Sequence, residues 1–196
     1  MTEKQSRLLR GRAGFTLIEV LVVVALMAIL VAFGGADLYR QIARRKLLAA
    51  ARQTSVLLRL ARLDAVKTSS AGIVRIQFDP VFNKHIIVNA FSDRDRDGQW
   101  DDGEPQLGYL ELGQGISVAG VIGFTPQTPP ATYNQAVFGS DGSIQAVGAF
   151  RFVNERSEAM EVAVPASTGI KVVLRKKDSG GVWREQGEGG TSWSWN

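Results

Sequence analysis

One apolar stretch near the start of the chain constrains the fold more than any other feature. From Leu17 to Phe33 every residue is apolar except Glu19, which makes 17 residues with a single charge. This length lies at the lower limit for a helix that crosses the hydrocarbon core of a membrane, which needs about 17–25 residues. The sequence therefore predicts an N-terminal helix that is inserted in a membrane.

A cleaved secretory signal peptide is the first alternative to this anchored helix. The apolar region of a signal peptide is shorter, carries no acidic residue and ends in a cleavage site of small residues. In this chain the small residue Gly14 precedes the apolar run, and Glu19 lies inside it. A cut at Gly14 would leave the apolar segment on the mature protein.

Glu19 is the unusual residue of this stretch. A carboxylate in an apolar membrane segment costs about 2.5–3.5 kcal/mol on insertion scales, and it is by default a functional-site hypothesis. One interpretation is that the N-terminal amine of a mature chain beginning at Phe15, in the same or a neighbouring subunit, neutralises the carboxylate. The other is that Glu19 lies close enough to the helix start to reach the lipid headgroups. Both interpretations remain open.

The segment Arg12–Leu21, which reads RAGFTLIEVL, resembles the class III signal of type IV pilins and type II secretion pseudopilins. By this resemblance, a prepilin peptidase cuts after Gly14 and methylates Phe15, and Glu19 takes part in subunit assembly. The resemblance further implies a single-pass protein of the inner membrane with a periplasmic C-terminal domain. Its partners would be other pilins or pseudopilins, contacted through the N-terminal helix.

The charge and the cysteine content of the chain exclude few classes of function. The net charge is +4, but residues 1–14 hold four basic residues and one acidic residue, so the chain from Phe15 onwards carries only +1. This balance gives no argument for a nucleic-acid partner. The chain has no cysteine, which excludes a disulfide framework and a thiolate site.

After the apolar run the composition stays helical. Gly34-Gly35 is a weak point, because glycine within a helix costs about 0.5–1 kcal/mol relative to alanine. Helical composition then continues from Asp37 to Lys67. Four residues recur at the spacing of one helical face and predict the side that packs on the following domain. They are Val56, Leu57, Leu60 and Leu63.

The pattern changes to short β segments after residue 70, separated by turn residues such as Asp141-Gly142. The predicted fold class is α+β and pilin-like: a long N-terminal helix, transmembrane in its first half and amphipathic in its second, packed on an antiparallel β-sheet domain. The predicted divisions are a removed leader 1–14, helix halves 15–36 and 37–70, a β-rich domain 71–184 and a Gly/Ser/Trp-rich tail 185–196. The predicted strands are 73–78, 86–91, 107–112, 116–122, 136–138, 143–146, 150–153, 161–164 and 170–175.

The β region resembles the GspH/FimT group of minor pseudopilins and minor pilins. The resemblance is carried by the acidic loop from Phe91 to Pro105, by residues 137–143 and by residues 162–170, and it departs from the family pattern at residues 169–172. It implies a structural subunit of the pseudopilus of a type II protein secretion system, not an enzyme. The alternative is a FimT-like minor pilin of a type IV pilus with a DNA-binding role in uptake.

The acidic loop matches the calcium-loop pattern at every specified position. Three aspartates at a spacing of two, a glycine and a final glutamate could supply the oxygen ligands that Ca²⁺ prefers. The candidate ligands are Asp93, Asp95, Asp97, Gln99, Asp101 and Glu104. The flanks read as strands and not as the two helices of an EF-hand, so a solvated hairpin loop without a metal stays the competing interpretation. No other cofactor is expected.

A basic cluster near the end of the chain is the candidate contact for DNA under the alternative function. It consists of Lys171, Arg175, Lys176 and Lys177, with Arg184 and Trp183 nearby. Basic side chains can bind the DNA backbone, and an aromatic ring can stack on bases. A charged edge strand, in which lysine prevents unwanted strand pairing, is the simpler interpretation.

The sequence offers nothing for catalysis. It has one histidine, His85, with no cysteine or second histidine to accompany it. No G-x-S-x-G, Walker A, H-E-x-x-H or dinucleotide-binding motif is present. No catalytic residue is therefore predicted.

Overall fold

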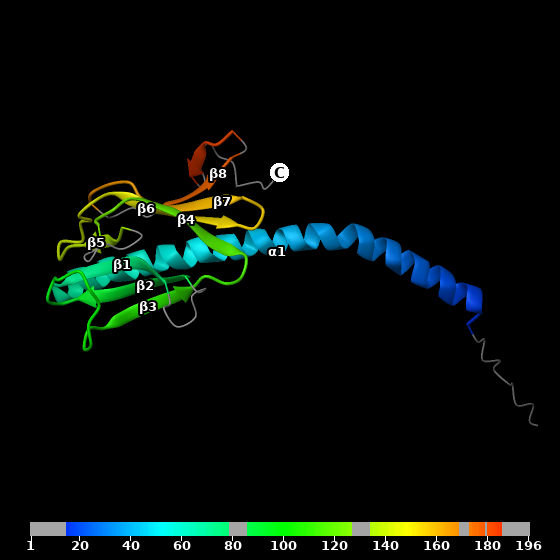
Figure 1. The fold of residues 1–196 in the computed structure, drawn as a ribbon, viewed down its shortest axis with the longest axis horizontal. Coiled ribbons are helices and arrows are strands. Elements are labelled where there is room, and N and C mark those ends of the chain that lie inside the picture. Colours follow the sequence, from blue (N-terminus) through cyan, green and yellow to red (C-terminus); the bar gives the residue numbers. More distant parts are fainter. Residues whose placement is uncertain (1–14, 79–85, 127–133, 169–172, 179, 186–196) are drawn as a thin grey trace, which may run out of the picture. The chain divides into compact units, whose positions relative to one another are not determined.

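The structure, a computed structural model, describes residues 15–78, 86–126, 134–168, 173–178 and 180–185 (Figure 1). The side chains of residues 31–36, 78, 86 and 87 are not described. The chain divides into two units, residues 1–41 and 42–196. Predictions that concern Gly14, His85, Lys171 and the tail beyond Glu185 lie outside the described residues.

The helix α1 spans Leu17–Thr68, 52 residues. The strands that follow are β1 Ala71–Phe78, β2 Ile86–Asp93, β3 Gln106–Glu111, β4 Ile116–Gly123, β5 Ala136–Phe138, β6 Gly148–Asn154, β7 Ala159–Val164, β8 Val173–Lys177 and β9 Trp183–Glu185. The backbone stays helical through Gly34-Gly35, so the glycine pair does not interrupt α1. Ser69, with φ of 55°, ends the helix in the left-handed region.

The strands form two antiparallel sheets. The first has the order β3-β2-β1-β5, in which β1 pairs with β2 over its whole length and with β5 only at Gly72 to Val74. The second has the order β4-β6-β7-β8-β9. Consecutive strands are neighbours throughout except where β5 joins β1 and β4 joins β6.

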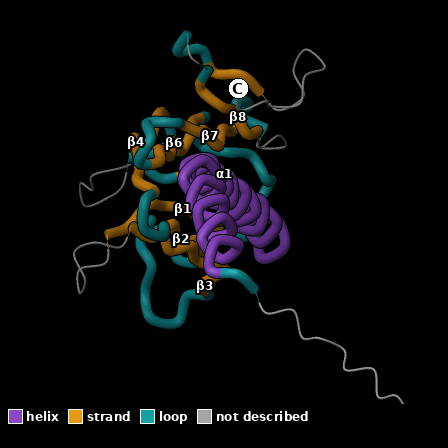
Figure 2. The backbone as a smooth tube through the Cα atoms, turned by 90° about the vertical axis from the view of Figure 1, so that its right-hand side faces the viewer, coloured by secondary structure: helices purple, strands orange, loops and turns teal. Residues whose placement is uncertain are grey.

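In the second unit, α1 lies between the two sheets (Figures 1 and 2). One continuous core joins them: Leu47, Leu58 and Ala61 of α1 are fully buried, as are Val74 of the first sheet and Phe150 of the second. The alanines of α1 allow a close approach. At Gly72 a side-chain Cβ would overlap the carbonyl of Ala61, so only glycine fits this position of β1.

These observations confirm the predicted fold class, an N-terminal helix packed on antiparallel sheets. The predicted helical stripe, by contrast, is wrong. Leu57 is buried, but Val56, Leu60 and Leu63 are 52%, 41% and 62% exposed. The helix buries two of its faces, one against each sheet, and most of the side chains that fill them are the smaller residues at positions 50, 51, 54, 61 and 65.

Three smaller predictions about the β region also need correction. Residues 143–146 form no strand, because Ile144 makes only an isolated bridge to Phe138. The strand predicted at 170–175 is β8, which runs to Lys177. Glu185, predicted to begin the tail, ends β9 and pairs with Arg175.

Candidate functional site

Phe15 and Glu19, the described residues of the predicted processing and assembly site, lie at the start of α1. Thr16 precedes the first helical residue, and its Oγ1 accepts a hydrogen bond from the backbone N–H of Glu19 at 3.3 Å. This is an N-cap, and Glu19 stands at the third helical position, where a carboxylate is favoured by the helix dipole. Both Phe15 and Glu19 are exposed in the single chain.

From Leu17 to Leu30, the side chains of α1 are exposed, and all but Glu19 are apolar. Leu17, Leu21 and Leu30 are 83%, 61% and 71% exposed. Among the described residues, no helix has an apolar stretch of the length and hydropathy needed to cross a membrane.

The acidic loop between β2 and β3 brings together three of the six predicted metal ligands. One carboxylate oxygen from each of Asp93, Asp95 and Asp97 lies within 4.8 Å of the other two. Asp93 is buried at the end of β2, whereas Asp95 and Asp97 are exposed. Burial raises the pKa of the Asp93 carboxyl, and hydrogen bonds from the N–H groups of Arg96 and Gly98 act in the opposite direction.

Backbone N–H groups orient each of these carboxylates. Asp93 accepts from Arg96 at 2.7 Å and from Gly98 at 3.0 Å. Asp95 Oδ1 accepts from the N–H of Asp97, and Asp97 Oδ1 accepts from the N–H of Gln99 at 2.6 Å. The loop turns tightly enough for these bonds because Arg96 and Gly98 have positive φ, 66° and 82°.

The other three predicted ligands have different positions. Glu104 Oε1 accepts from the N–H of Arg94 at 2.6 Å, and its Oε2 accepts from the N–H of Asp101 at 3.3 Å. Glu104 therefore joins the two ends of the loop. Gln99 and Asp101 take part through their backbone N–H groups, and neither belongs to the carboxylate cluster.

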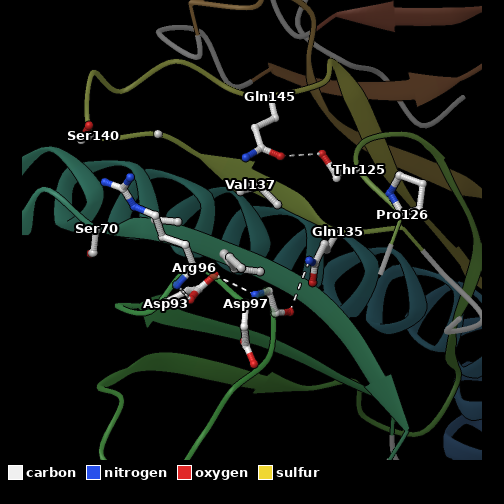
Figure 3. A pocket seen from close by; sticks show the side chains of 14 residues that line it. Ser70, Asp93, Arg96, Asp97, Thr125, Pro126, Gln135, Val137, Ser140 and Gln145 are labelled. Atoms are coloured by element: carbon white, nitrogen blue, oxygen red, sulfur yellow. Dashed lines mark hydrogen bonds between the residues drawn. The ribbon is translucent and has the colours of Figure 1, made fainter. Parts of the chain in front are cut away.

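A cavity of about 320 Å³ lies beside this cluster (Figure 3). Asp93, Asp97 and Gly98 line it from the acidic loop, and Gln135 lines it from the segment before β5. Gln135 is 3% exposed, and its Nε2 donates to the carbonyl of Gly98 at 3.4 Å. Its Oε1 is buried and has no hydrogen-bond partner among the described residues.

Two cations near the loop could compete for its carboxylates, and neither pairs with them directly. The Arg96 side chain donates to the carbonyl of Ser69 at 3.1 Å. The Arg75 guanidinium stacks 4.9 Å from the centre of the Phe91 ring. Burial lowers the pKa of Arg75, and the charges of Asp97 and Glu104 oppose that shift.

Gln135 and Arg75 are residues near this loop that the sequence did not predict. Both come from strand segments distant from the loop along the chain, and neither belongs to a local motif. Only the pairing of β1 with β2 and with β5 brings them to the loop, so no signal in the sequence could have identified them.

The predicted basic cluster is divided between two faces of β8. Arg175 lies opposite Glu161 and Glu185 and bonds to both, at 3.2 and 3.1 Å. Lys176 lies opposite the buried Met160, on the other face of the sheet. Burial lowers the pKa of Lys176, and the nearby Arg44 lowers it further.

The face that Arg175 occupies is an ion-pair network, not an open basic surface. Glu161, 4% exposed, also bonds to Arg151 at 2.7 Å. Arg151 in turn stacks 4.8 Å from the centre of the Trp183 ring. For Arg175, burial would lower the pKa, but the two glutamates outweigh it and raise the pKa.

Comparison with known proteins locates the clearest likeness at the N-terminus. Residues 9–34 match the family model for the prokaryotic N-terminal methylation motif. No curated protein matches the chain. Among solved structures, the chain is similar to the minor pseudopilin EpsH from the Type 2 Secretion System of Vibrio cholerae, with 13% identity and a TM-score of 0.40 over 74% of this chain and 98% of that chain.

The motif match confirms the prediction of a prepilin-type N-terminus. It covers the predicted cleavage residue Gly14, the predicted methylated residue Phe15 and Glu19. The chain therefore combines this N-terminal motif with a long helix packed on antiparallel sheets.

Proposed function

We propose that this chain is a minor pseudopilin, a structural subunit of the pseudopilus of a type II protein secretion system. The observation that carries the proposal is the methylation motif at residues 9–34, which stands at the head of a 52-residue helix. In this account, a prepilin peptidase cleaves after Gly14 and methylates Phe15.

The first half of α1 supports an assembly role. A helix with this many exposed apolar side chains needs a covering surface, because large exposed apolar patches are rare in isolated soluble proteins. Before assembly the inner membrane would cover residues 15–36, with the β domain on the periplasmic side. After assembly the corresponding helices of neighbouring subunits would cover them.

Glu19 would then determine how far the helix of each subunit is shifted along that of its neighbour. Among packed apolar helices, burying its carboxylate is unfavourable unless a positive group lies near it. The new N-terminal amine of Phe15 in a neighbouring subunit supplies that charge. One paired position along the helix would be favoured over the others.

The alternative is a minor pilin that binds DNA through Lys171, Arg175, Lys176 and Lys177. It has weaker support. Arg175 is engaged by two glutamates, and Lys176 and Lys177 lie on opposite faces of β8. A DNA backbone would contact at most part of this set from any one side.

Gene deletion followed by complementation separates the two functions. We expect deletion to abolish type II secretion of exported enzymes while DNA uptake continues, and the wild-type chain to restore secretion. Glu19→Ala should fail to restore it, whereas Lys176→Ala/Lys177→Ala should restore it fully. Loss of DNA uptake with normal secretion would overturn the proposal.

Cross-linking tests the assembly step directly. Since the chain contains no cysteine, one introduced at Val20 or Val24 would be the sole thiol. We expect disulfide cross-links, on oxidation, between this cysteine and one introduced at the corresponding helix position of a co-expressed pseudopilin, and we expect them to depend on Glu19. A cysteine at Gln53, on the exposed face of the second half of α1, is the matched control.

A further inference from the structure

We propose that the loop between β2 and β3 binds Ca²⁺. The ligands are the carboxylates of Asp93, Asp95 and Asp97, and the amide oxygen of Gln135 faces the ion directly or through a metal-bound water. This proposal does not depend on the proposed function, since its ligands lie in the β domain and not in the first half of α1.

The first argument is the placement of the three carboxylates. Their oxygens lie within 4.8 Å of one another. Three carboxylates held this close repel one another unless a cation offsets their charge. Within the described part of the chain, no ion pair joins Arg75, Arg94 or Arg96 to these carboxylates; the Arg96 side chain binds the carbonyl of Ser69 and Arg75 stacks on Phe91.

The second and independent argument is Gln135. Its side chain is buried, its Nε2 is fixed by the carbonyl of Gly98, and its Oε1 has no partner in the described part of the chain. Leaving a buried amide oxygen without a partner is unfavourable, because the oxygen has lost its hydrogen bonds to water. Because Gln135 lines the same cavity as Asp93 and Asp97, a cation or its bound water would satisfy this oxygen (Figure 3).

The chemistry of the ligands selects the metal. All are oxygens, which suits hard cations, and the absence of cysteine from the sequence excludes a thiolate site for zinc. Mg²⁺ demands near-ideal octahedral geometry and keeps most of its water, whereas Ca²⁺ accepts irregular sets of six to eight oxygens. A surface loop open on one side fits Ca²⁺ better.

The role of Glu104 differs from that of the last residue in the calcium-loop pattern. Its two oxygens accept from the N–H groups of Arg94 and Asp101, so it holds the loop closed. Glu104 is left out of the ligand set because its carboxylate does not belong to the cluster that Asp93, Asp95 and Asp97 form. The ion would instead connect the loop to the strand segment that carries Gln135.

The test uses the full chain in detergent, with CaCl₂ as the probe and MgCl₂ as the comparison. We expect millimolar Ca²⁺ to raise the melting temperature, since a ligand that binds only the folded state stabilises it. Mg²⁺ at the same concentration should raise it less. No Ca²⁺-dependent change in melting temperature, or an equal change with Mg²⁺, would overturn the proposal.

Variants locate the site. Asp95→Asn and Asp97→Asn keep an oxygen that can accept the backbone hydrogen bond but lose the charge. Each should weaken Ca²⁺ affinity about tenfold or more, as loss of a coordinating or supporting group does in other metal sites. Asp102→Asn removes the same charge from the same loop outside the cluster, and it should change affinity less than about twofold. Equal losses of Ca²⁺ affinity in Asp97→Asn and Asp102→Asn would mean that only the overall negative charge of the loop matters. That result would contradict the site.

Gln135→Met tests the second argument. Methionine has a similar length but no amide oxygen, so Ca²⁺ affinity should fall severalfold. The melting temperature without Ca²⁺ reports the lost bond to Gly98 and is read separately. Unchanged affinity in this variant would remove Gln135 from the site and leave the proposal without its independent support.

Discussion

Among single residues, Gly72 on β1 has one of the closest approaches in the β domain. Any Cβ at this position would overlap the backbone carbonyl of Ala61 on α1, which cannot move without displacing the helix. We expect Gly72→Ala to destabilise the fold by about 1–3 kcal/mol, as overpacking of a core does. Thermal unfolding followed by circular dichroism measures this loss.

Gly113→Ala is the matched control for Gly72. A Cβ at Gly113 would meet no atom within 4 Å, and the position does not require a positive φ. Its melting temperature should stay within a degree or two of the wild type. Equal stability of the two variants would contradict the close packing of α1 on β1.

The lowered pKa of Glu158 leads to a prediction of how the free energy of unfolding depends on pH. Burial would raise the pKa of its carboxyl, but hydrogen bonds from Asn154 and Arg44 outweigh burial and hold the pKa below the ordinary value of 4.5. Because the pKa of Glu158 is lowered in the folded state, its carboxylate stabilises the fold fully at pH values above the ordinary pKa of 4.5. This stabilisation is lost as the pH falls below 4.5 and then through the pKa of the folded state.

Glu158→Gln should therefore be less stable than the wild type near neutral pH, and the difference should shrink in acid below about pH 4. Urea unfolding at several pH values measures it. Glu111→Gln, an exposed residue on β3, is the control for a general charge effect. A difference that grows in acid would contradict the role of the Arg44–Glu158 pair.

The acidic residues show how far single positions could be predicted from sequence. The spacing of Asp93, Asp95 and Asp97 follows directly from a local pattern, because an oxygen cluster can form within one tight loop. Gln135 and Arg75 reach the same loop through strand pairing, which a local pattern does not contain. Nothing in the residues around Gln135 distinguishes it from any other polar residue next to a strand.

Within α1, two leucines only five residues apart differ sharply in how far their side chains are buried. Leu58 is fully buried between the sheets, whereas Leu63 is 62% exposed. We expect Leu58→Ala to cost about 2–5 kcal/mol, because it leaves a cavity in the core. Leu63→Ala should change the free energy of unfolding by less than about 0.5 kcal/mol in the isolated subunit.

Denaturant unfolding of both variants tests this assignment. Similar losses would mean that the exposed face of α1 is covered in the single chain, contrary to the structure. The stripe of Val56, Leu60 and Leu63 was predicted as core because periodicity identifies apolar faces without saying which is covered. Here small residues, chiefly alanine, line most of the buried faces, since the helix lies close to two sheets.

At the scale of the whole molecule, the order of elements was predictable but the arrangement of sheets was not. A change from helical to alternating patterns after residue 70 indicates a helix followed by strands. The separation into two sheets depends on β5 pairing with β1 and β4 pairing with β6, both across long stretches of chain.

We propose above that this chain is a pilin-like subunit that a prepilin peptidase processes after Gly14. Intact-mass measurement of the membrane-extracted protein, with and without a co-expressed prepilin peptidase, tests it most directly. Gly14→Val should block processing, whereas Gly11→Val, a glycine three residues earlier in the same segment, should not. For the wild-type chain with the peptidase, we expect loss of residues 1–14 and gain of one methyl group on Phe15. An unprocessed chain, with the peptidase active on another pilin in the same cells, would contradict it.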